Sequence, residues 1–285
     1  MTVREIEREL ARLRDASTEP GAPPRLRTSV MTHIAWVPER WVDQATETLA
    51  GLAERHPSRT ILLFPRPDDL PDRIDGEVDL RCFVQDGERR EVCSEVISLA
   101  LCGARASVPA SIVTPLLVSD LPVFLRWRGR PDFGSQQLEQ LTGVADRLVV
   151  DSREWPDVRA GLGRLPELFD RVVVSDIGWA RTEPWRAAVA RLWPEVAEAR
   201  GMRVAGPEAE ALLLSAWLGA RLGRNVALEH EPAGEIELVE VDGRQALPER
   251  LVTKTPSDLL SDELEVFGRD RIYEEAVRSF SSRPT

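Results

Sequence analysis

Short apolar runs that alternate with helical segments are the feature that most limits how this chain can fold. Residues 28–37 and 60–64 are strand-like, and the segment between them places Trp41, Ala45, Leu49 and Leu52 on one helical face. A strand, a helix and a strand in this order are typical of two parallel strands joined by a crossover. The first half of the chain therefore predicts a sheet with helices packed against it.

The same alternation continues along the chain. A hairpin is predicted for 78–84 and 90–101, because the turn between them contains Asp86-Gly87. Helices are expected at 106–117, 135–143 and 156–165, and strands at 122–127, 147–150 and 172–174. Later segments predict helices at 184–193 and 207–222, an antiparallel strand pair at 226–231 and 235–241, and two helices within 256–280.

These elements define the expected architecture. We predict an α/β fold with an N-terminal mixed or parallel sheet, flanking helices and a smaller α+β C-terminal domain. An amphipathic helix and a Pro-rich and Gly-rich linker are assigned to 1–25, the N-terminal α/β domain to 26–168, and the C-terminal domain to 169–285.

Charge and composition exclude several classes of function. The chain has 285 residues, and 37 basic against 48 acidic residues give a formal charge of −11. A nucleic-acid-binding protein is therefore not expected, since phosphates require a concentrated basic patch. No apolar stretch is long enough to cross a bilayer and the first residues are charged, so we expect a cytoplasmic protein without membrane contact. Cys82, Cys93 and Cys102 lack C-x-x-C spacing and are interpreted as buried, inert thiols.

Two segments rich in tryptophan and arginine suggest recognition of a partner. Each follows or ends a strand-like run, where α/β proteins usually meet ligands, and both residue types are enriched at binding hot spots. We predict that the partner-binding residues are Asp120, Arg126, Trp127, Arg128, Asp151, Trp179, Arg181, Trp185 and Arg186. Stacking of these tryptophans and arginines inside the fold is the alternative that the sequence leaves open. Trp36, Trp41, Trp193 and Trp217 are expected in the core.

The sequence contains no pattern that indicates an enzyme. The three histidines lack metal-ligand spacing, and the motifs G-x-S-x-G, G-x-x-x-x-G-K and G-x-G-x-x-G do not occur. We therefore expect no catalytic residues, no cofactor and no metal. The alternative is a sugar-phosphate-binding protein or enzyme in which Asp120, Asp151 and Asp176 converge at strand ends beside Arg126 and Arg181.

Four motifs in order give the chain a family resemblance. They are His-Pro-Ser-Arg-Thr at 56–60, Asp-Leu-Pro-Val running to Gly129, Asp151-Ser152 after a strand, and the segment Trp179–Arg186. In these residues the chain resembles the glucose-6-phosphate dehydrogenase assembly protein family, OpcA. The resemblance implies a non-enzymatic protein that binds glucose-6-phosphate dehydrogenase and promotes its assembly or active state in the oxidative pentose phosphate pathway.

Overall fold

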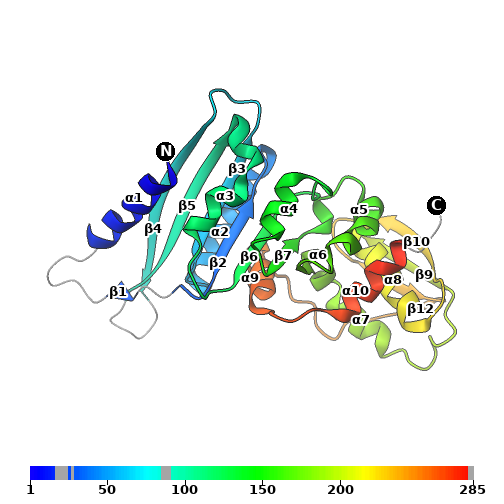
Figure 1. The fold of residues 1–285 in the computed structure, drawn as a ribbon. Coiled ribbons are helices and arrows are strands. Elements are labelled where there is room, and N and C mark those ends of the chain that lie inside the picture. The colour runs from blue at the N-terminus through cyan, green and yellow to red at the C-terminus, as the bar shows by residue number, and fades with distance from the viewer. Residues whose placement is uncertain (17–24, 27–28, 85–90, 282–285) are drawn as a thin grey trace. The chain divides into compact units, whose positions relative to one another are not determined.

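The computed structural model describes residues 1–16, 25–26, 29–84 and 91–281 (Figure 1). The predicted linker and the turn of the predicted hairpin lie outside these described residues. The chain divides into two compact units: Met1–Val149 with Pro256–Val266, and Val150–Thr255 with Phe267–Thr285.

Unit 1 is built on a mixed sheet. Its strands follow the order β1-β5-β3-β2-β6-β7, with β4 paired to β5. The β4–β5 pair is antiparallel, whereas β1–β5, β5–β3, β3–β2, β2–β6 and β6–β7 are parallel. The bounds are β1 (Arg25–Leu26), β2 (Thr32–Trp36), β3 (Arg59–Arg66), β4 (Arg73–Val84), β5 (Glu91–Cys102), β6 (Val123–Trp127) and β7 (Arg147–Val150). The predicted parallel sheet and the hairpin strands are confirmed.

The connections β2→β3 and β5→β6 cross the sheet in opposite directions. Because such crossovers are right-handed, their helices lie on opposite faces of the sheet. α2 (Val42–Arg55), after the short η1 (Glu39–Trp41), packs with α9 (Pro256–Glu265), and α3 (Pro109–Val113) packs with α4 (Gln136–Thr142). Figure 1 shows α1 (Val3–Ala16) along β4, which it contacts.

The helix predicted at 106–117 is interrupted. The structure has η2 (Gly103–Ser107), α3 and η3 (Thr114–Leu116) instead of one continuous helix. Pro109 and Pro115 explain the breaks, since a proline lacks the N–H that a continuing helix needs and clashes with the preceding turn.

Unit 2 combines helices with a second, smaller sheet. β8 (Val173–Asp176), which is not a strand of the smaller sheet, runs into α6 (Ile177–Arg181), and α7 (Glu183–Ala190) follows. η4 (Ser152–Glu154), α5 (Val158–Arg164) and η5 (Leu165–Leu168) precede it, and α10 (Arg271–Ser281) packs on α8 (Glu208–Leu222). Residues 209–219 of α8 are all buried, so this helix is the centre of the unit.

The predicted antiparallel pair in this region is wrong. β10 (Ala227–Pro232) and β11 (Leu238–Val241) lie on either side of β9 (Gly201–Gly206), in the order β10-β9-β11-β12, with β12 at Arg244–Gln245. β10 is parallel to β9, and β11 is antiparallel to it. The sequence pattern concealed β9, because it is a short strand with a glycine at each end and an arginine in the middle.

The interpretation of the cysteines is also corrected. Cys82 in β4 and Cys93 in β5 are register partners in the antiparallel pair, and they form a disulfide with a Cα–Cα distance of 4.0 Å. Spacing along the chain cannot reveal such a pair, because strand register sets it. Cys102 is a free, buried thiol, as predicted.

The described helices also bear on the membrane prediction. None of the helices in the described part of the chain is both long and apolar enough to span a bilayer.

Candidate functional site

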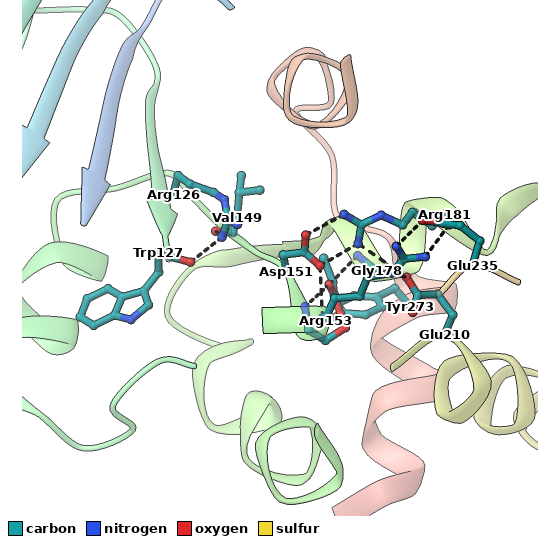
Figure 2. A network of polar contacts seen from close by, with 12 residues as sticks. Arg126, Trp127, Val149, Asp151, Arg153, Gly178, Arg181, Glu210, Glu235 and Tyr273 are labelled. Atoms are coloured by element: carbon teal, nitrogen blue, oxygen red, sulfur yellow. Dashed lines mark hydrogen bonds and ion pairs between the residues drawn. The ribbon is translucent and has the colours of Figure 1, made fainter. Parts of the chain in front are cut away.

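A network of charged side chains lies in unit 2, where strands end (Figure 2). Asp151 directly follows the last residue of β7, and Asp176 is the last residue of β8. Each aspartate caps the helical turn that follows its strand: Asp151 accepts a hydrogen bond from the N–H of Arg153, and Asp176 accepts one from the N–H of Gly178. Local capping therefore fixes the position of the two carboxylates independently of contacts with distant residues.

Asp151 and Arg181 form the centre of this network. Two guanidinium nitrogens of Arg181, from the end of α6, donate to the two carboxylate oxygens of Asp151 at 2.8 Å each. Both side chains are largely buried, with 17% of Arg181 and 9% of Asp151 exposed. This bidentate geometry is the strongest arrangement available to the pair. The structure thus brings together two residues that the sequence predicted for one site.

Arg153 extends the network outward to two glutamates. Its Nε donates to Oε1 of Glu210 on α8, and its two terminal nitrogens donate to the carboxylate of Glu235 at 2.9 Å each. Glu210 is fully buried, whereas 76% of the Glu235 side chain is exposed. Arg181 also lies 3.6 Å from Glu210. The network therefore runs from the surface at Glu235 to the interior.

Burial changes the acidity of Glu210. Loss of solvation raises the pKa of this carboxyl to about 7, although the nearby Arg153 and Arg181 act in the opposite direction. Its second oxygen, Oε2, has no hydrogen-bond partner among the described residues. Near neutral pH the protonated and the ionised form of Glu210 are therefore both populated.

Asp176 is the second buried acid in the network. Its Oδ1 accepts from the backbone N–H of Ser152 at 3.0 Å and of Gly178 at 2.8 Å. The hydroxyl of Tyr273 lies 3.5 Å from Oδ2. Burial, and then the charge of Asp151, raise the pKa of Asp176 to about 6. Asp176 thus holds the backbone of two strand ends together.

The second tryptophan–arginine segment is stacked inside unit 2. The Arg186 guanidinium lies 3.6 Å from the ring centroid of Trp179, whose indole N–H donates to Asp270 at 2.7 Å. Arg186 also donates to the Thr182 hydroxyl at 3.0 Å. Trp179 and Trp185 are each only 5% exposed. For this segment the structure agrees with the alternative of stacking within the fold.

The first tryptophan–arginine segment is buried in unit 1. The Trp127 ring stacks on Trp36 with centroids 5.2 Å apart, and Arg126 donates to the carbonyl oxygens of Trp127 and Val149 (Figure 2). Arg128 lies over the Trp41 ring. Arg126, Trp127 and Arg128 are at most 8% exposed, so their side chains also contribute to packing.

Asp120 lies at the opposite end of its strand from the other two predicted aspartates. It is exposed, has a positive φ of 65°, and precedes β6, so it lies at the amino end of that strand. Asp151 and Asp176 lie at the carboxyl ends of theirs. The alternative function required all three aspartates to follow their strands. Asp120 precedes its strand, so strand direction does not support this convergence.

The chemistry of the network is that of a closed set of ion pairs. Arg153 and Arg181 are both held by carboxylates of the same chain, and no group of three or more metal-ligating side chains occurs in the described ranges. A substrate phosphate would have to displace these internal partners. The arrangement fixes the backbone that follows β7 and β8, because Asp176 accepts from the backbone N–H groups of Ser152 and Gly178.

Sequence reasoning missed Arg153, Glu210, Glu235 and Tyr273, which complete the network. Glu210 had a usable signal: it is a single acid within the apolar run Ala209–Leu214. The prediction that Trp193 lies in the core is wrong, because 63% of this residue is exposed. It follows α7, where the chain forms turns that lack the regular helical face on which the prediction was based.

Comparison with known proteins gives matches over both halves of the chain. The model of the glucose-6-phosphate dehydrogenase subunit N-terminal domain matches residues 50–167, and that of the C-terminal domain matches 172–277. An OxPP cycle protein named OpcA from Nostoc punctiforme is 25% identical over 201 residues, covering 67% of this chain and 43% of the relative. Its counterpart from Synechococcus elongatus is 24% identical over 205 residues, covering 68% and 46%. The chain thus spans less than half the length of these relatives.

The domain boundary predicted between 168 and 169 stays a prediction. The two family models meet between residues 167 and 172. The first compact unit instead consists of Met1–Val149 together with the later segment Pro256–Val266.

Proposed function

We propose that this chain, which belongs to the OpcA family of glucose-6-phosphate dehydrogenase assembly proteins, is a non-catalytic accessory protein of that dehydrogenase. It binds the dehydrogenase in the cytoplasm and promotes its assembly or active state in the oxidative pentose phosphate pathway. The observation that carries this proposal is the pair of family models, both described as parts of a glucose-6-phosphate dehydrogenase subunit, in order along the chain.

The polar network supports a role without catalysis. Its arginines are held by internal carboxylates, and its two buried acids cap turns or remain inside α8. Such a network gives a unit rigid, defined loops at the strand ends. A rigid surface suits an accessory protein, because it costs little conformational entropy to bind.

The two tryptophan–arginine segments enter this proposal mainly as supports. Trp127 and Trp179 are buried and stacked, so they position the loop that follows β6 and the helix α6 that follows β8. Among the predicted partner-binding residues, Asp120 has an exposed side chain and is available for direct contact.

The mechanism is a shift between conformations of the dehydrogenase. An accessory protein promotes the active arrangement only if it binds that arrangement more tightly than the inactive one. A tenfold preference corresponds to about 1.4 kcal/mol, which is within reach of one well-packed contact. No cofactor is needed for such an effect.

The test combines binding and rate. Purified chain and dehydrogenase are mixed, and their co-elution and the rate of glucose 6-phosphate oxidation are measured together. We expect a joint peak and a higher rate than the dehydrogenase alone. Absence of both effects would refute the proposal. Thermal stabilisation of the isolated chain by glucose 6-phosphate, without the dehydrogenase, would favour the sugar-phosphate alternative instead.

A further inference from the structure

The segments that follow β2 and β6 leave the sheet of unit 1 at the point where its strand order reverses. β2 continues to β3 on one side and β6 continues to β7 on the other, so right-handed crossovers take the chain to opposite faces of the sheet. The last residues of the two strands, Trp36 and Trp127, are register partners. In open α/β sheets, ligands bind outside the carboxyl ends of the strands at such a point. The topology therefore predicts a ligand site at residues 37–41 and 128–135.

These two segments meet at one indole ring. The guanidinium carbon of Arg128 lies 4.9 Å from the ring centroid of Trp41, and that of Arg40 lies 5.6 Å from it. Arg128 is buried and also donates a hydrogen bond of 2.9 Å to Gln44 of α2. Arg40 is exposed. Arg128 thus positions the ring, and Arg40 is open to solvent beside it.

Trp41 carries a hydrogen-bond donor that the described part of the chain leaves unused. Its indole Nε1 is buried and has no hydrogen-bond partner among the described residues. Buried N–H groups without a partner are rare in native proteins, because their lost hydrogen bonds to water are then not replaced. This N–H is therefore suited to an acceptor that comes from outside the chain.

A second donor lies close to the indole N–H. Gly129 has a positive φ of 75°, and a Cβ at this position would lie 2.9 Å from Nε1 of Trp41 and 3.1 Å from Nη2 of Arg40. Both nitrogens are therefore near one point beside the Gly129 backbone. A larger residue would be strained at this φ and would crowd both donors. The glycine keeps the two donors side by side.

Charge decides which ligand these donors suit. Indole and guanidinium groups donate hydrogen bonds and accept none, so the ligand must supply the acceptors. Arg40 and Arg130 are exposed, and neither forms an ion pair with a carboxylate within the described ranges. This holds although the same segments contain the exposed acids Glu39, Asp43 and Asp132. A guanidinium without a carboxylate partner matches the oxygens of an oxyanion.

We propose that Arg40 and the indole N–H of Trp41 bind a phosphate group, with Arg130 adding positive charge beside them. The exposed side chain of Arg40 turns toward the phosphate, which then reaches Nε1. Phosphate is favoured over a carboxylate because its second negative charge can be neutralised by the second arginine. Free phosphate and a phosphomonoester share this group. The inference concerns the isolated chain and does not rest on the proposed function.

A nuclear magnetic resonance experiment observes the indole N–H directly. The full chain is labelled with ¹⁵N-tryptophan, and the signal of Trp41 is identified among the eight tryptophans by its absence from Trp41→Phe. Inorganic phosphate is added at constant ionic strength, with chloride as the balancing anion. We expect the Trp41 proton signal to move downfield and to saturate, because the proton becomes hydrogen-bonded to an anion. The other indole signals should stay in place.

Affinity is measured by the rise of the melting temperature with phosphate concentration. Arg40→Gln removes the charge and Trp41→Phe removes only the N–H, whereas Arg4→Gln is a matched control at an exposed arginine of α1. We expect the affinity to fall about tenfold or more for Arg40→Gln and several-fold for Trp41→Phe. Arg40→Lys should recover part of it. Arg4→Gln should bind like the wild type, and it also accounts for the general stabilisation of proteins by phosphate salts.

The outcomes are distinct. Methyl phosphate that binds as well as inorganic phosphate would identify a phosphomonoester as the source, and methyl phosphate that fails would identify free phosphate. An unmoved Trp41 signal, or equal phosphate affinity in the wild type, Arg40→Gln and Trp41→Phe, would refute the site. Acetate that binds as tightly as phosphate would overturn the choice of ligand. Stabilisation by glucose 6-phosphate supports the sugar-phosphate alternative only if it persists in Arg40→Gln. No arm contains the dehydrogenase, so the proposed function is tested separately.

Discussion

Asp151 and Arg181 are joined by two parallel hydrogen bonds of 2.8 Å, although 30 residues separate them in the chain. The pair links the end of β7 to the end of α6, so it fixes the two turns relative to each other. Because both side chains are mostly buried, water cannot solvate either charge fully when its partner is removed.

Replacing Asp151 tests the weight of this pair. Asp151→Asn should lower the free energy of unfolding by about 3–5 kcal/mol, because it leaves the Arg181 charge without its bidentate partner. Glu167→Gln is the control, since its pair with Arg164 is about half exposed and should contribute less than about 1 kcal/mol. Urea unfolding followed by circular dichroism gives both values, and equal losses in the two variants would contradict this account.

The raised pKa of Glu210 predicts a pH dependence of stability. Its pKa moves from 4.5 to about 7 on folding, so between these values the native state holds a proton that the unfolded state has lost. The free energy of unfolding should therefore fall as the pH rises through this window, by roughly 3 kcal/mol. The pKa of Asp176 also rises on folding, to about 6, so its ionisation lowers the free energy of unfolding further as the pH rises.

Glu210→Gln isolates the contribution of that residue. The variant carries no titratable group at this position, so its unfolding free energy should lose less between pH 4.5 and pH 7 than that of the wild type. Parallel curves for the two proteins would show that Glu210 does not titrate in this range.

Two glycines of α5 should respond to alanine in opposite ways. A Cβ at Gly161 would lie 2.4 Å from the Trp155 ring, whereas a Cβ at Gly163 would have no atom within 4 Å. Gly161→Ala should cost about 1–3 kcal/mol through overpacking. Gly163→Ala should stabilise by up to about 1 kcal/mol, since alanine favours the helix. Thermal unfolding shows whether each variant melts above or below the wild type. A Gly161→Ala protein as stable as the wild type would refute the close packing of Gly161 on Trp155.

The Cys82–Cys93 disulfide should stabilise unit 1. It closes a loop with a sequence separation of 11, for which the loss of chain entropy in the unfolded state corresponds to about 3 kcal/mol. Addition of dithiothreitol should therefore lower the melting temperature of the wild type. The Cys82→Ser/Cys93→Ser variant should already melt at that lower temperature and show no response, whereas Cys102→Ser should respond like the wild type. An unchanged wild-type melting temperature on reduction would argue against the cross-link.

Local sequence was sufficient for much of the fold. Apolar runs and helical faces predicted β2, α2 and β3 together with β6, α8 and the two last helices, because a single element carries its own periodicity. The strand pattern likewise predicted Asp151 and Asp176 at strand ends, and in the structure each of them caps the turn that follows its strand.

Tertiary structure decided which distant segments meet. The strand order around β9, the Cys82–Cys93 register and the exposure of Trp193 all depend on contacts between residues far apart in the chain. The same holds for Glu210, whose burial and raised pKa arise only when α8 packs at the centre of unit 2. Periodicity specifies which face of an element is apolar, but the free energy of packing selects the neighbour that covers it.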